Sequence, residues 1–368
     1  MGRTDSRSGT RRTTGRNVNR YDSRQRENRR RRRRRRRNRQ VGCLSVILVI
    51  LFAATAGIFY IKTNKSDEQR VAEYAAKNYQ NLGTESLKAE NLCVASGNVK
   101  LEGTPDTNGF FSAGLFDVDG NTVDYAYELH KKVYPASTTK VLTALIAIEQ
   151  GNLEDEVTVS KAAAASSFAA DESVSGIKEG DKLTLKDLLH GLILQSGNDA
   201  AVAIAEHISG SETEFAKLMN QRAAELMATE SHFVNSNGLH NEDHYTTAYD
   251  LYLIFNECIK HQEFIDIINS EKYVANVTGA DGTARDIEME PTNFYALGDA
   301  KEPENVTLVG GKTGTTQAAG NCLIFMEKDK NDRPYISIVM GASTKELLYE
   351  DMTAIIEAIP GEAENPNS

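Results

Sequence analysis

An uncharged stretch of 21 residues, Val41–Ile61, lies just after a run of nine arginines, Arg29–Arg37. As an α-helix the stretch would be about 30 Å long, which is the thickness of the hydrocarbon core of a bilayer. Clustered arginines remain on the cytoplasmic side of a membrane. We therefore expect residues 41–62 to form a transmembrane anchor in the cell membrane. The N-terminus would be cytoplasmic, and the remainder of this single-pass chain would be extracytoplasmic.

A cleaved signal peptide is the alternative interpretation of this stretch. Ala54-Thr55-Ala56 has the small-x-small pattern of a cleavage site. The apolar run nevertheless continues through Gly57–Ile61, which a cleaved peptide does not need. This continuation favours an uncleaved anchor.

The charges divide unevenly along the chain. Residues 1–40 hold 18 arginines, three acidic residues and almost no apolar side chains, so they predict a disordered cytoplasmic tail. Attraction to anionic lipid is the simpler role for its arginines, and a nucleic-acid-binding arm is the alternative. Residues 41–368 hold 24 basic and 49 acidic residues. Because phosphate contacts need clustered basic groups, we expect no nucleic acid as a partner of this part.

The residues after the anchor predict one main folded region. Residues 63–88 are polar and indicate a stalk, residues 89–360 carry the dense apolar pattern of a domain, and residues 361–368 indicate a flexible C-terminus. The four cysteines are too few and too scattered for a disulfide framework or a C-x-x-C metal site.

Strand patterns occur at both ends of this region, with helical patterns between them. Thr139–Gln150 is apolar on nearly all sides and predicts a buried helix that ends at Gly151. The overall pattern predicts an α/β (α+β) fold, in which an antiparallel sheet from both ends is flanked by helices and carries a helical subdomain. The other expected elements are a hairpin of Phe111–Val123 and Asp124–Val133 turned at Asp119-Gly120-Asn121, helices over 184–268, strands Val306–Gly310, Asn321–Glu327 and Tyr335–Gly341, and a final helix Lys345–Ala358.

The first of three short motifs is Ser137-x-x-Lys140, at the start of the predicted buried helix. Residues i and i+3 share a helix face, so the amine can reach the hydroxyl. A lysine can act as the base for a serine nucleophile if burial and nearby positive charge lower its pKa. Ser175-x-x-Lys178 also matches, but it lies in a polar stretch and is interpreted as a chance match.

The second motif, Ser196-Gly197-Asn198, interrupts a helical pattern. Its two polar side chains would lie at a helix–helix junction, where they can face a cleft. A helix cap or turn is the simpler explanation of such a triplet taken alone. Ser96-Gly97-Asn98 repeats it in a polar stretch upstream.

The third motif is Gly311-Lys312-Thr313-Gly314-Thr315, placed just after the expected strand Val306–Gly310. Lys312 and Thr313 together offer a cation and a hydroxyl to a carboxylate. The glycines would let a substrate backbone approach closely.

In this order the three motifs are associated with penicillin-binding proteins and class A β-lactamases. The segments that contain them resemble the serine-type D-Ala-D-Ala carboxypeptidases, the low-molecular-mass penicillin-binding proteins, and this resemblance implies the penicillin-binding/β-lactamase-like fold. It extends from about Phe111 to Gly341. The matching segments are YPASTTKVLTALIAIEQG, LLHGLILQSGNDAAVAIAEHISGS, SHFVNSNGL followed by HYTTAYDL, and GGKTGTTQAAGNCLIF.

The resemblance implies a catalytic role for four residues. Ser137 would attack the carbonyl of the penultimate D-Ala of a peptidoglycan stem peptide and become acylated, and Lys140 would take its proton. Ser196 and Asn198 would pass the proton to the leaving D-Ala and hold the peptide.

It also implies how substrates bind. Lys312 and Thr313 would contact the terminal carboxylate, with Gly314 and Thr315 in the same substrate-binding segment. The backbone N–H groups of Ser137 and Thr315 would form the oxyanion hole. β-Lactams would acylate the same serine as inhibitors. The resemblance implies neither a cofactor nor a metal.

Two positions depart from the family pattern. Thr315 replaces the His or aromatic residue that many members have after K-T-G. Leu347 or Leu348 stands where many carry an Arg near the substrate carboxylate. The resemblance therefore leaves open which basic residue, if any, completes the carboxylate site.

Two other functions are compatible with the same motifs. A class A β-lactamase has S-D-N and an E-x-x-L-N loop, whereas this chain has S-G-N and no E-x-x-L-N between Ser196 and Lys312. A penicillin-binding scaffold without activity is the second alternative. His240 and His244 have acidic residues between them, but a turn explains this segment better than a metal site does. Cys322 is predicted to be a small buried apolar residue.

Overall fold

The computed structural model describes residues 92–95, 97–105, 107 and 109–360. The predicted tail (1–40), anchor (41–62), stalk (63–88) and C-terminus (361–368) lie outside these residues, as does Ser96 of the upstream S-G-N triplet. Among the helices of the described part, none has the length and apolar character needed to cross a bilayer.

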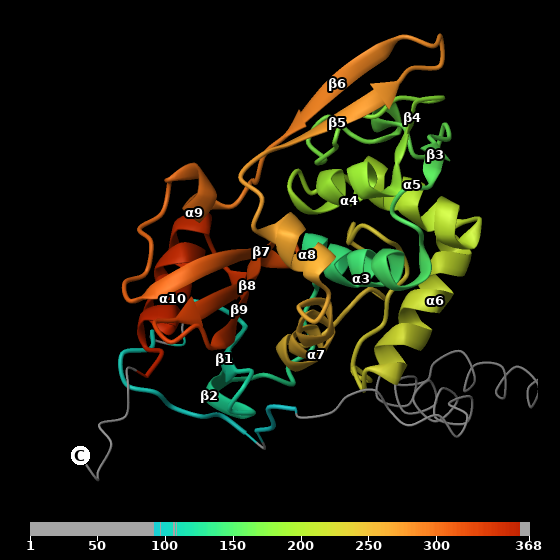
Figure 1. Ribbon diagram of the computed structural model, residues 1–368. Coiled ribbons are helices and arrows are strands. Elements are labelled where there is room, and N and C mark those ends of the chain that lie inside the picture. Colours follow the sequence, from blue (N-terminus) through green and yellow to red (C-terminus); the bar gives the residue numbers. More distant parts are fainter. Residues whose placement is uncertain (1–91, 96, 106, 108, 361–368) are drawn as a thin grey trace, which may run out of the picture. The chain divides into compact units, whose positions relative to one another are not determined.

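The main sheet has five strands in the order β2-β1-β9-β8-β7, and every neighbouring pair is antiparallel (Figure 1). Its strands come from two distant parts of the chain. Ser112 of β1 lies opposite Met340 of β9, so the early hairpin is joined directly to the late strands. The predicted antiparallel sheet built from both ends is therefore confirmed. The strands are β1 (Ser112–Asp117), β2 (Thr122–Tyr127), β7 (Val306–Thr316), β8 (Gly320–Asp329) and β9 (Pro334–Ala342).

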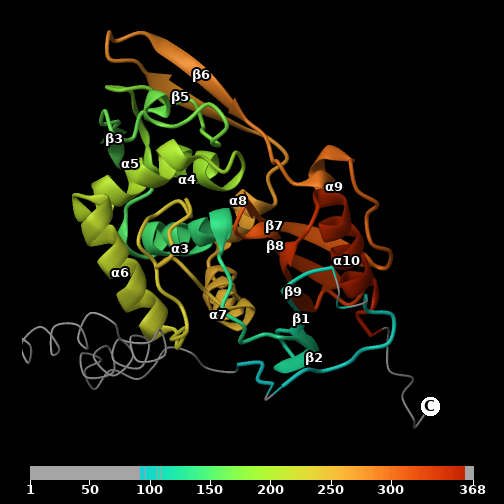
Figure 2. The same cartoon turned by 180° about the vertical axis from the view of Figure 1, so that it is seen from behind.

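Helices cover both faces of this sheet (Figures 1 and 2). α9 (Phe294–Leu297) and α10 (Lys345–Glu357) pack on one face, and α7 (Ala248–Cys258) and α8 (Gln262–Ile268) pack on the other. Alternate side chains of β8 accordingly enter two different cores. Leu323 and Phe325 pack with α10, and Ile324 and Met326 pack with the helical side. Burying an apolar side chain of this size contributes about 1.5–3 kcal/mol.

Helix α3 (Lys140–Gln150) lies at the centre of the helical part, where it contacts every surrounding helix. Its buried residues run without interruption from Lys140 to Ala147, which confirms the helix predicted from the apolar run. Gly151 ends it as predicted, and a Cβ there would come within 2.4 Å of a Leu185 methyl group. The surrounding helices are α4 (Leu185–Ile193), α5 (Asn198–Ser209), α6 (Glu212–Glu225), α7 and α8.

Two features of the fold differ from the sequence expectation. A second, four-stranded sheet in the order β3-β4-β5-β6 joins the helical part, and the long β5–β6 hairpin projects from it (Figure 1). β7 is also longer than expected, because it runs through the K-T-G segment instead of ending before it. β3 and β4 have three residues each and show no usable alternation, and glycines weaken the strand signal of the K-T-G segment. The six-residue strands β5 and β6 were not expected either. The second sheet contains β3 (Glu156–Thr158), β4 (Lys182–Thr184), β5 (Tyr273–Thr278) and β6 (Ala284–Met289).

Candidate active site

Ser137 lies in a tight 3₁₀ turn, Ala136–Thr139, that leads directly into α3. Ala136 has a φ of +49°, a left-handed conformation that costs a residue other than glycine about 1–3 kcal/mol. Two glycines make the turn possible by lying against its backbone. A Cβ on Gly314 would lie 2.9 Å from the Ser137 nitrogen, and a Cβ on Gly238 would lie 1.8 Å from the Ala136 oxygen. The close approach that Gly314 permits is therefore to the backbone of the turn that contains Ser137.

The Lys140 amine is completely buried and lies within hydrogen-bond distance of three oxygen atoms. In its neutral form it donates to two of them and accepts from the Ser137 hydroxyl. Its Nζ lies 2.9 Å from Ser137 Oγ, 2.8 Å from Asn198 Oδ1 and 2.7 Å from the carbonyl oxygen of Asn237. Burial, assisted by the positive charge of Lys312, holds the pKa of Lys140 well below its usual value, and the carboxylates of Asp199 and Glu172 oppose the shift. A neutral amine next to a serine hydroxyl is the arrangement that a lysine general base requires.

A second buried amine lies behind the next serine. Lys312 Nζ donates to Ser196 Oγ at 3.0 Å and to the carbonyl oxygen of Thr313 at 2.8 Å. Burial lowers the pKa of Lys312 to about 7. Ser196 has a φ of +57°, and this left-handed turn separates α4 from Asn198, the first residue of α5. The second motif is thus a junction between helices, as the sequence predicts.

These groups border one cavity of about 270 Å³. Ser137, Ser196, Thr313, Gly314 and Thr315 line it directly. Two other predicted site residues, Lys140 and Lys312, each lie one hydrogen bond behind this surface, and Asn198 is hydrogen-bonded to Lys140. All three motifs therefore meet at one place, although Lys140 and Asn198 are 58 residues apart and Ser196 and Lys312 are 116 residues apart along the chain. The remaining lining residues are Ser173, Thr292, Phe294, Cys322, Lys345, Leu348 and Tyr349.

The sequence model of a protein family described as D-alanyl-D-alanine carboxypeptidase matches residues 106–344. The chain belongs to this family. The match includes every motif residue that meets at the cavity, and it confirms the resemblance seen in the sequence.

Individual relatives agree with the assignment. The chain is 34% identical over 254 residues to the D-alanyl-D-alanine carboxypeptidase DacF of Bacillus subtilis, which covers 67% of this chain and 61% of the relative. It is 32% identical over 233 residues to DacC of Escherichia coli, which covers 61% of this chain and 55% of the relative. The chain thus spans less than two thirds of the length of these curated relatives.

Solved structures show the same fold. The Streptomyces K15 DD-transpeptidase superposes with a TM-score of 0.63 at 27% identity, covering 69% of this chain and 98% of that one. Penicillin binding protein 5 from Haemophilus influenzae superposes with a TM-score of 0.59 at 27% identity, covering 69% of this chain and 70% of that one. These neighbours confirm the α+β fold with antiparallel sheets and helices.

The α10 end of the cavity resolves the choice between the two leucines. Leu348 lines the cavity and is buried, whereas the Leu347 side chain is 37% exposed and does not line it. A basic residue is nevertheless present, because Lys345, the first residue of α10, also lines the cavity. Its Nζ lies 5.5 Å from the centre of the Phe294 ring. Comparison with the family pattern overlooks this lysine, because the family's Arg aligns with Leu347 or Leu348 and Lys345 lies two residues before Leu347.

Two further contributors are missing from the motifs. Asn237 acts through its backbone carbonyl, which no side-chain pattern reveals. Asp199 is buried and accepts hydrogen bonds from the N–H groups of Ser175 and Gly176 at 2.7 and 2.9 Å, and from Ser175 Oγ at 2.9 Å. Ser175 of the second S-x-x-K match is therefore engaged with Asp199.

The histidines of the 240–244 segment do not converge. His240 is exposed and packs edge-on against Tyr134, whereas His244 is buried. Cys322 is fully buried as predicted, and burial raises the pKa of its thiol to about 12.

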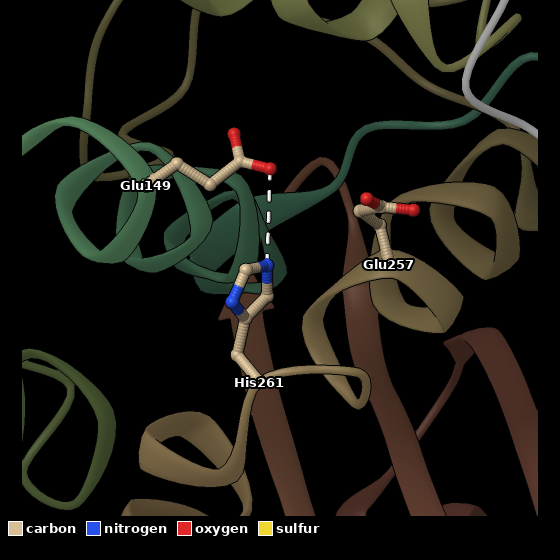
Figure 3. Close-up of side chains that lie close together, drawn as sticks. All are labelled: Glu149, Glu257 and His261. Atoms are coloured by element: carbon tan, nitrogen blue, oxygen red, sulfur yellow. Dashed lines mark ion pairs between the residues drawn. The ribbon is translucent and has the colours of Figure 1, made fainter.

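Within the described ranges, one group of three side chains has the spacing of metal ligands: Glu149, Glu257 and His261 (Figure 3). Arg222 already lies against both glutamates. Its guanidinium donates to the two Glu149 oxygens at 2.6 and 2.7 Å and lies 3.4 Å from Glu257 Oε1. The cluster is therefore an ion-pair network that joins the ends of α3 and α7 to α6. The guanidinium of Arg222 supplies the positive charge that a metal ion would otherwise supply to the two glutamates.

Proposed function

We propose that the protein is a membrane-anchored serine D-Ala-D-Ala carboxypeptidase that removes the terminal D-Ala from peptidoglycan stem pentapeptides and is acylated by β-lactams. One observation carries the proposal. The Ser137 hydroxyl, at the surface of the cavity, lies 2.9 Å from a buried amine whose pKa is held well below its usual value.

Acylation begins with proton transfer from Ser137 to neutral Lys140 as Oγ attacks the carbonyl carbon of the penultimate D-Ala. Negative charge develops on the carbonyl oxygen, where the N–H groups of Ser137 and Thr315 stabilise it. When the tetrahedral intermediate collapses, the C–N bond breaks and the leaving amine takes a proton from Ser196. Lys312 lies 3.0 Å from the Ser196 oxygen and supports this transfer. The proton that Lys140 took from Ser137 then replaces the one that Ser196 has lost, so Lys140 is neutral again. Asn198 holds Lys140 and the peptide in place.

Deacylation regenerates the enzyme. Water attacks the ester carbonyl and gives a proton to neutral Lys140. The bond to Ser137 Oγ then breaks, and the serine receives that proton from Lys140. The products are free D-Ala and a stem peptide that is one residue shorter.

We assign the substrate carboxylate to Thr313, Thr315 and Lys345. Among the described residues that line the cavity, Lys345 is the one with a basic side chain. Lys312 lies behind the surface with a pKa of about 7, so it is only partly protonated at neutral pH. An exposed ammonium at the cavity edge supplies the long-range attraction that a buried, half-titrated amine cannot.

Transpeptidation is a second candidate, because the Streptomyces K15 structures are titled DD-transpeptidase. The acyl-enzyme would then transfer its peptide to an amine instead of water. Incubation with a D-Ala-D-Ala peptide and an added D-amino acid, followed by mass analysis of the products, separates the two outcomes. Hydrolysed peptide supports the carboxypeptidase, and amide product in excess supports the transferase.

Labelled penicillin tests the assignment of the nucleophile. We expect one covalent adduct on Ser137, and Ser137→Ala should abolish both the adduct and D-Ala release. Ser175→Ala is the matched control from the other S-x-x-K sequence and should change neither reaction. A stable adduct without D-Ala release would support the non-catalytic scaffold instead, and rapid hydrolysis of penicillin would support a β-lactamase.

The membrane location is part of the same proposal and rests on the 21 uncharged residues after the arginine run. We expect the full-length chain to fractionate with membranes and to keep its arginine-rich tail. A chain that starts at Ser66 should be soluble and active, since the motifs all follow it. A mature N-terminus at Gly57 would show instead that the stretch is a cleaved signal.

A further inference from the structure

The residue before the nucleophile is held in its left-handed conformation by contacts to its carbonyl oxygen. Thr139 Oγ1 donates a hydrogen bond to the Ala136 oxygen at 2.8 Å, and Gly238 packs against the same oxygen. A strained conformation persists only where its surroundings enforce it. The contacts that fix Ala136 therefore also fix the direction in which Ser137 leaves the turn.

The Thr139 hydroxyl is itself held by a buried histidine. His244 Nε2 lies 2.8 Å from Thr139 Oγ1, and His244 Nδ1 accepts the backbone N–H of Val234 at 3.2 Å. Because an amide N–H can only donate, Nδ1 carries no proton, and the proton of the neutral ring is on Nε2. Nε2–H then donates to Thr139, whose own hydrogen remains available for Ala136. This single arrangement satisfies every group in the chain of hydrogen bonds.

The surroundings of His244 keep the ring neutral and fixed. It is buried, and its edge packs against Phe233 with ring centres 5.5 Å apart. Burial is the main cause that lowers the pKa of His244 to about 3. The hydrogen-bond direction is therefore constant near neutral pH.

His244 also belongs to the loop that completes the lysine site. This loop, residues 227–247 between α6 and α7, supplies the Asn237 carbonyl that accepts from Lys140 Nζ at 2.7 Å. The contact between His244 and Thr139 ties the loop to the start of α3. Both members of the Ser137–Lys140 pair thus depend on it for their positions.

We propose that His244 is a positioning residue for the acylation of Ser137. It acts through its hydrogen bond to Thr139 and the hydrogen bond from Thr139 to the Ala136 carbonyl. The inference rests on the proposed function, because its effect is measured as acylation at that serine. Neither His244 nor Thr139 lines the cavity. Substitution of either residue should therefore displace Ser137 and Lys140 without removing a contact to the substrate.

The test uses the full-length protein, labelled penicillin for the acylation rate constant, and a D-Ala-D-Ala peptide for kcat and KM. His244→Phe and Thr139→Val should each lower acylation by about 10- to 100-fold, since small displacements of reacting atoms have effects of this size. kcat should fall while KM changes little. Thr139→Ser keeps the hydroxyl and should retain the rate. Because both residues act in one chain, the double variant should fall no further than the more impaired single variant.

His190→Phe is the matched control for the loss of a buried histidine. His190 stacks on Tyr273 with ring centres 3.5 Å apart and bonds to the Lys186 carbonyl within its own helix, α4. This variant should lose stability in urea unfolding and keep its acylation rate.

Three results would overturn the inference: acylation by His244→Phe within threefold of the unsubstituted protein, an equal loss in His190→Phe, or losses that multiply in the double variant. If His244→Phe does not fold, the Thr139→Val and Thr139→Ser pair decides by the same threefold criterion. Failure of the unsubstituted protein to react with penicillin would refute the proposed function itself, so the two failures are distinguishable.

Discussion

Gly314→Ala probes the contact between β7 and the turn Ala136–Thr139, which contains Ser137. A Cβ at this position would lie 2.9 Å from the Ser137 nitrogen and 3.0 Å from both the Pro135 oxygen and the Thr138 nitrogen, where ordinary contact begins at 3.4 Å. All three are backbone atoms, so no side-chain rotation can relieve the overlap. The turn must move by about 0.5 Å relative to β7. Since a displacement of about 1 Å can cost 100-fold, we expect acylation by penicillin to slow about tenfold.

The same substitution should cost about 1–3 kcal/mol of unfolding free energy, as overpacked sites usually do. Gly114→Ala is the control. Its Cβ would meet the ends of the Phe116 and Leu129 side chains at 2.7–2.9 Å, and none of these three residues lines the cavity. We expect a similar stability loss there with an unchanged acylation rate. Stopped-flow acylation and urea unfolding measure both quantities. Equal rates for folded Gly314→Ala and the unsubstituted protein would refute the argument that this glycine sets the position of Ser137.

Three further predictions concern the lysines of the site. Lys140→Arg should lower acylation by several orders of magnitude while the protein stays folded, because a guanidinium does not release its proton at neutral pH; near-normal acylation would place the base elsewhere. Lys345→Ala should raise KM for a D-Ala-D-Ala peptide about tenfold and leave kcat nearly unchanged, whereas Leu347→Ala should change neither constant. Equal effects of the two substitutions would show that Lys345 does not bind the substrate carboxylate. Lys312 has a pKa of about 7 in the folded protein, against an ordinary value of 10.5. Between pH 7 and about pH 10 the unfolded state therefore binds more protons, and the free energy of unfolding rises with pH. We expect the difference in unfolding free energy between the unsubstituted protein and Lys312→Met to change in favour of the unsubstituted protein over this range. Urea unfolding at pH 6, 7.5 and 9 measures this difference, and a gap that does not change with pH would contradict it.

The sequence was most informative where one period or one motif decided the structure. The apolar run after Ser137 could only be a buried helix, and the strand patterns at both ends made a shared sheet the simplest arrangement. The three motifs predicted eight site residues, which the fold brings together at one cavity. Their catalytic roles remain predictions.

The sequence was least informative where a backbone atom or a position in space decides the chemistry. The Asn237 carbonyl has no side-chain signature, and Lys345 is recognisable only once α10 is seen beside the cavity. The strands of three residues in the second sheet are too short to show a period. The K-T-G segment was expected just after the strand Val306–Gly310. Its glycines have weak strand propensity, but the segment pairs with β8, with Lys312 opposite Ile324, and so belongs to β7.

The pairing of β1 with β9 sets the order in which the molecule can assemble. Ser112 of β1 cannot pair until Met340 of β9 has been synthesised. In a chain that emerges from the ribosome or a translocon with its N-terminus first, the edge of β1 is therefore exposed until β9 has emerged. At typical synthesis rates of about 5–20 residues per second, that interval lasts on the order of tens of seconds. The turn that contains Ser137 is also pressed into place by Gly314 of β7, which emerges late. We therefore expect a nascent chain to be inactive until nearly all of the domain has emerged. During this interval the unpaired edge of β1 is a site where a chaperone could bind and prevent aggregation.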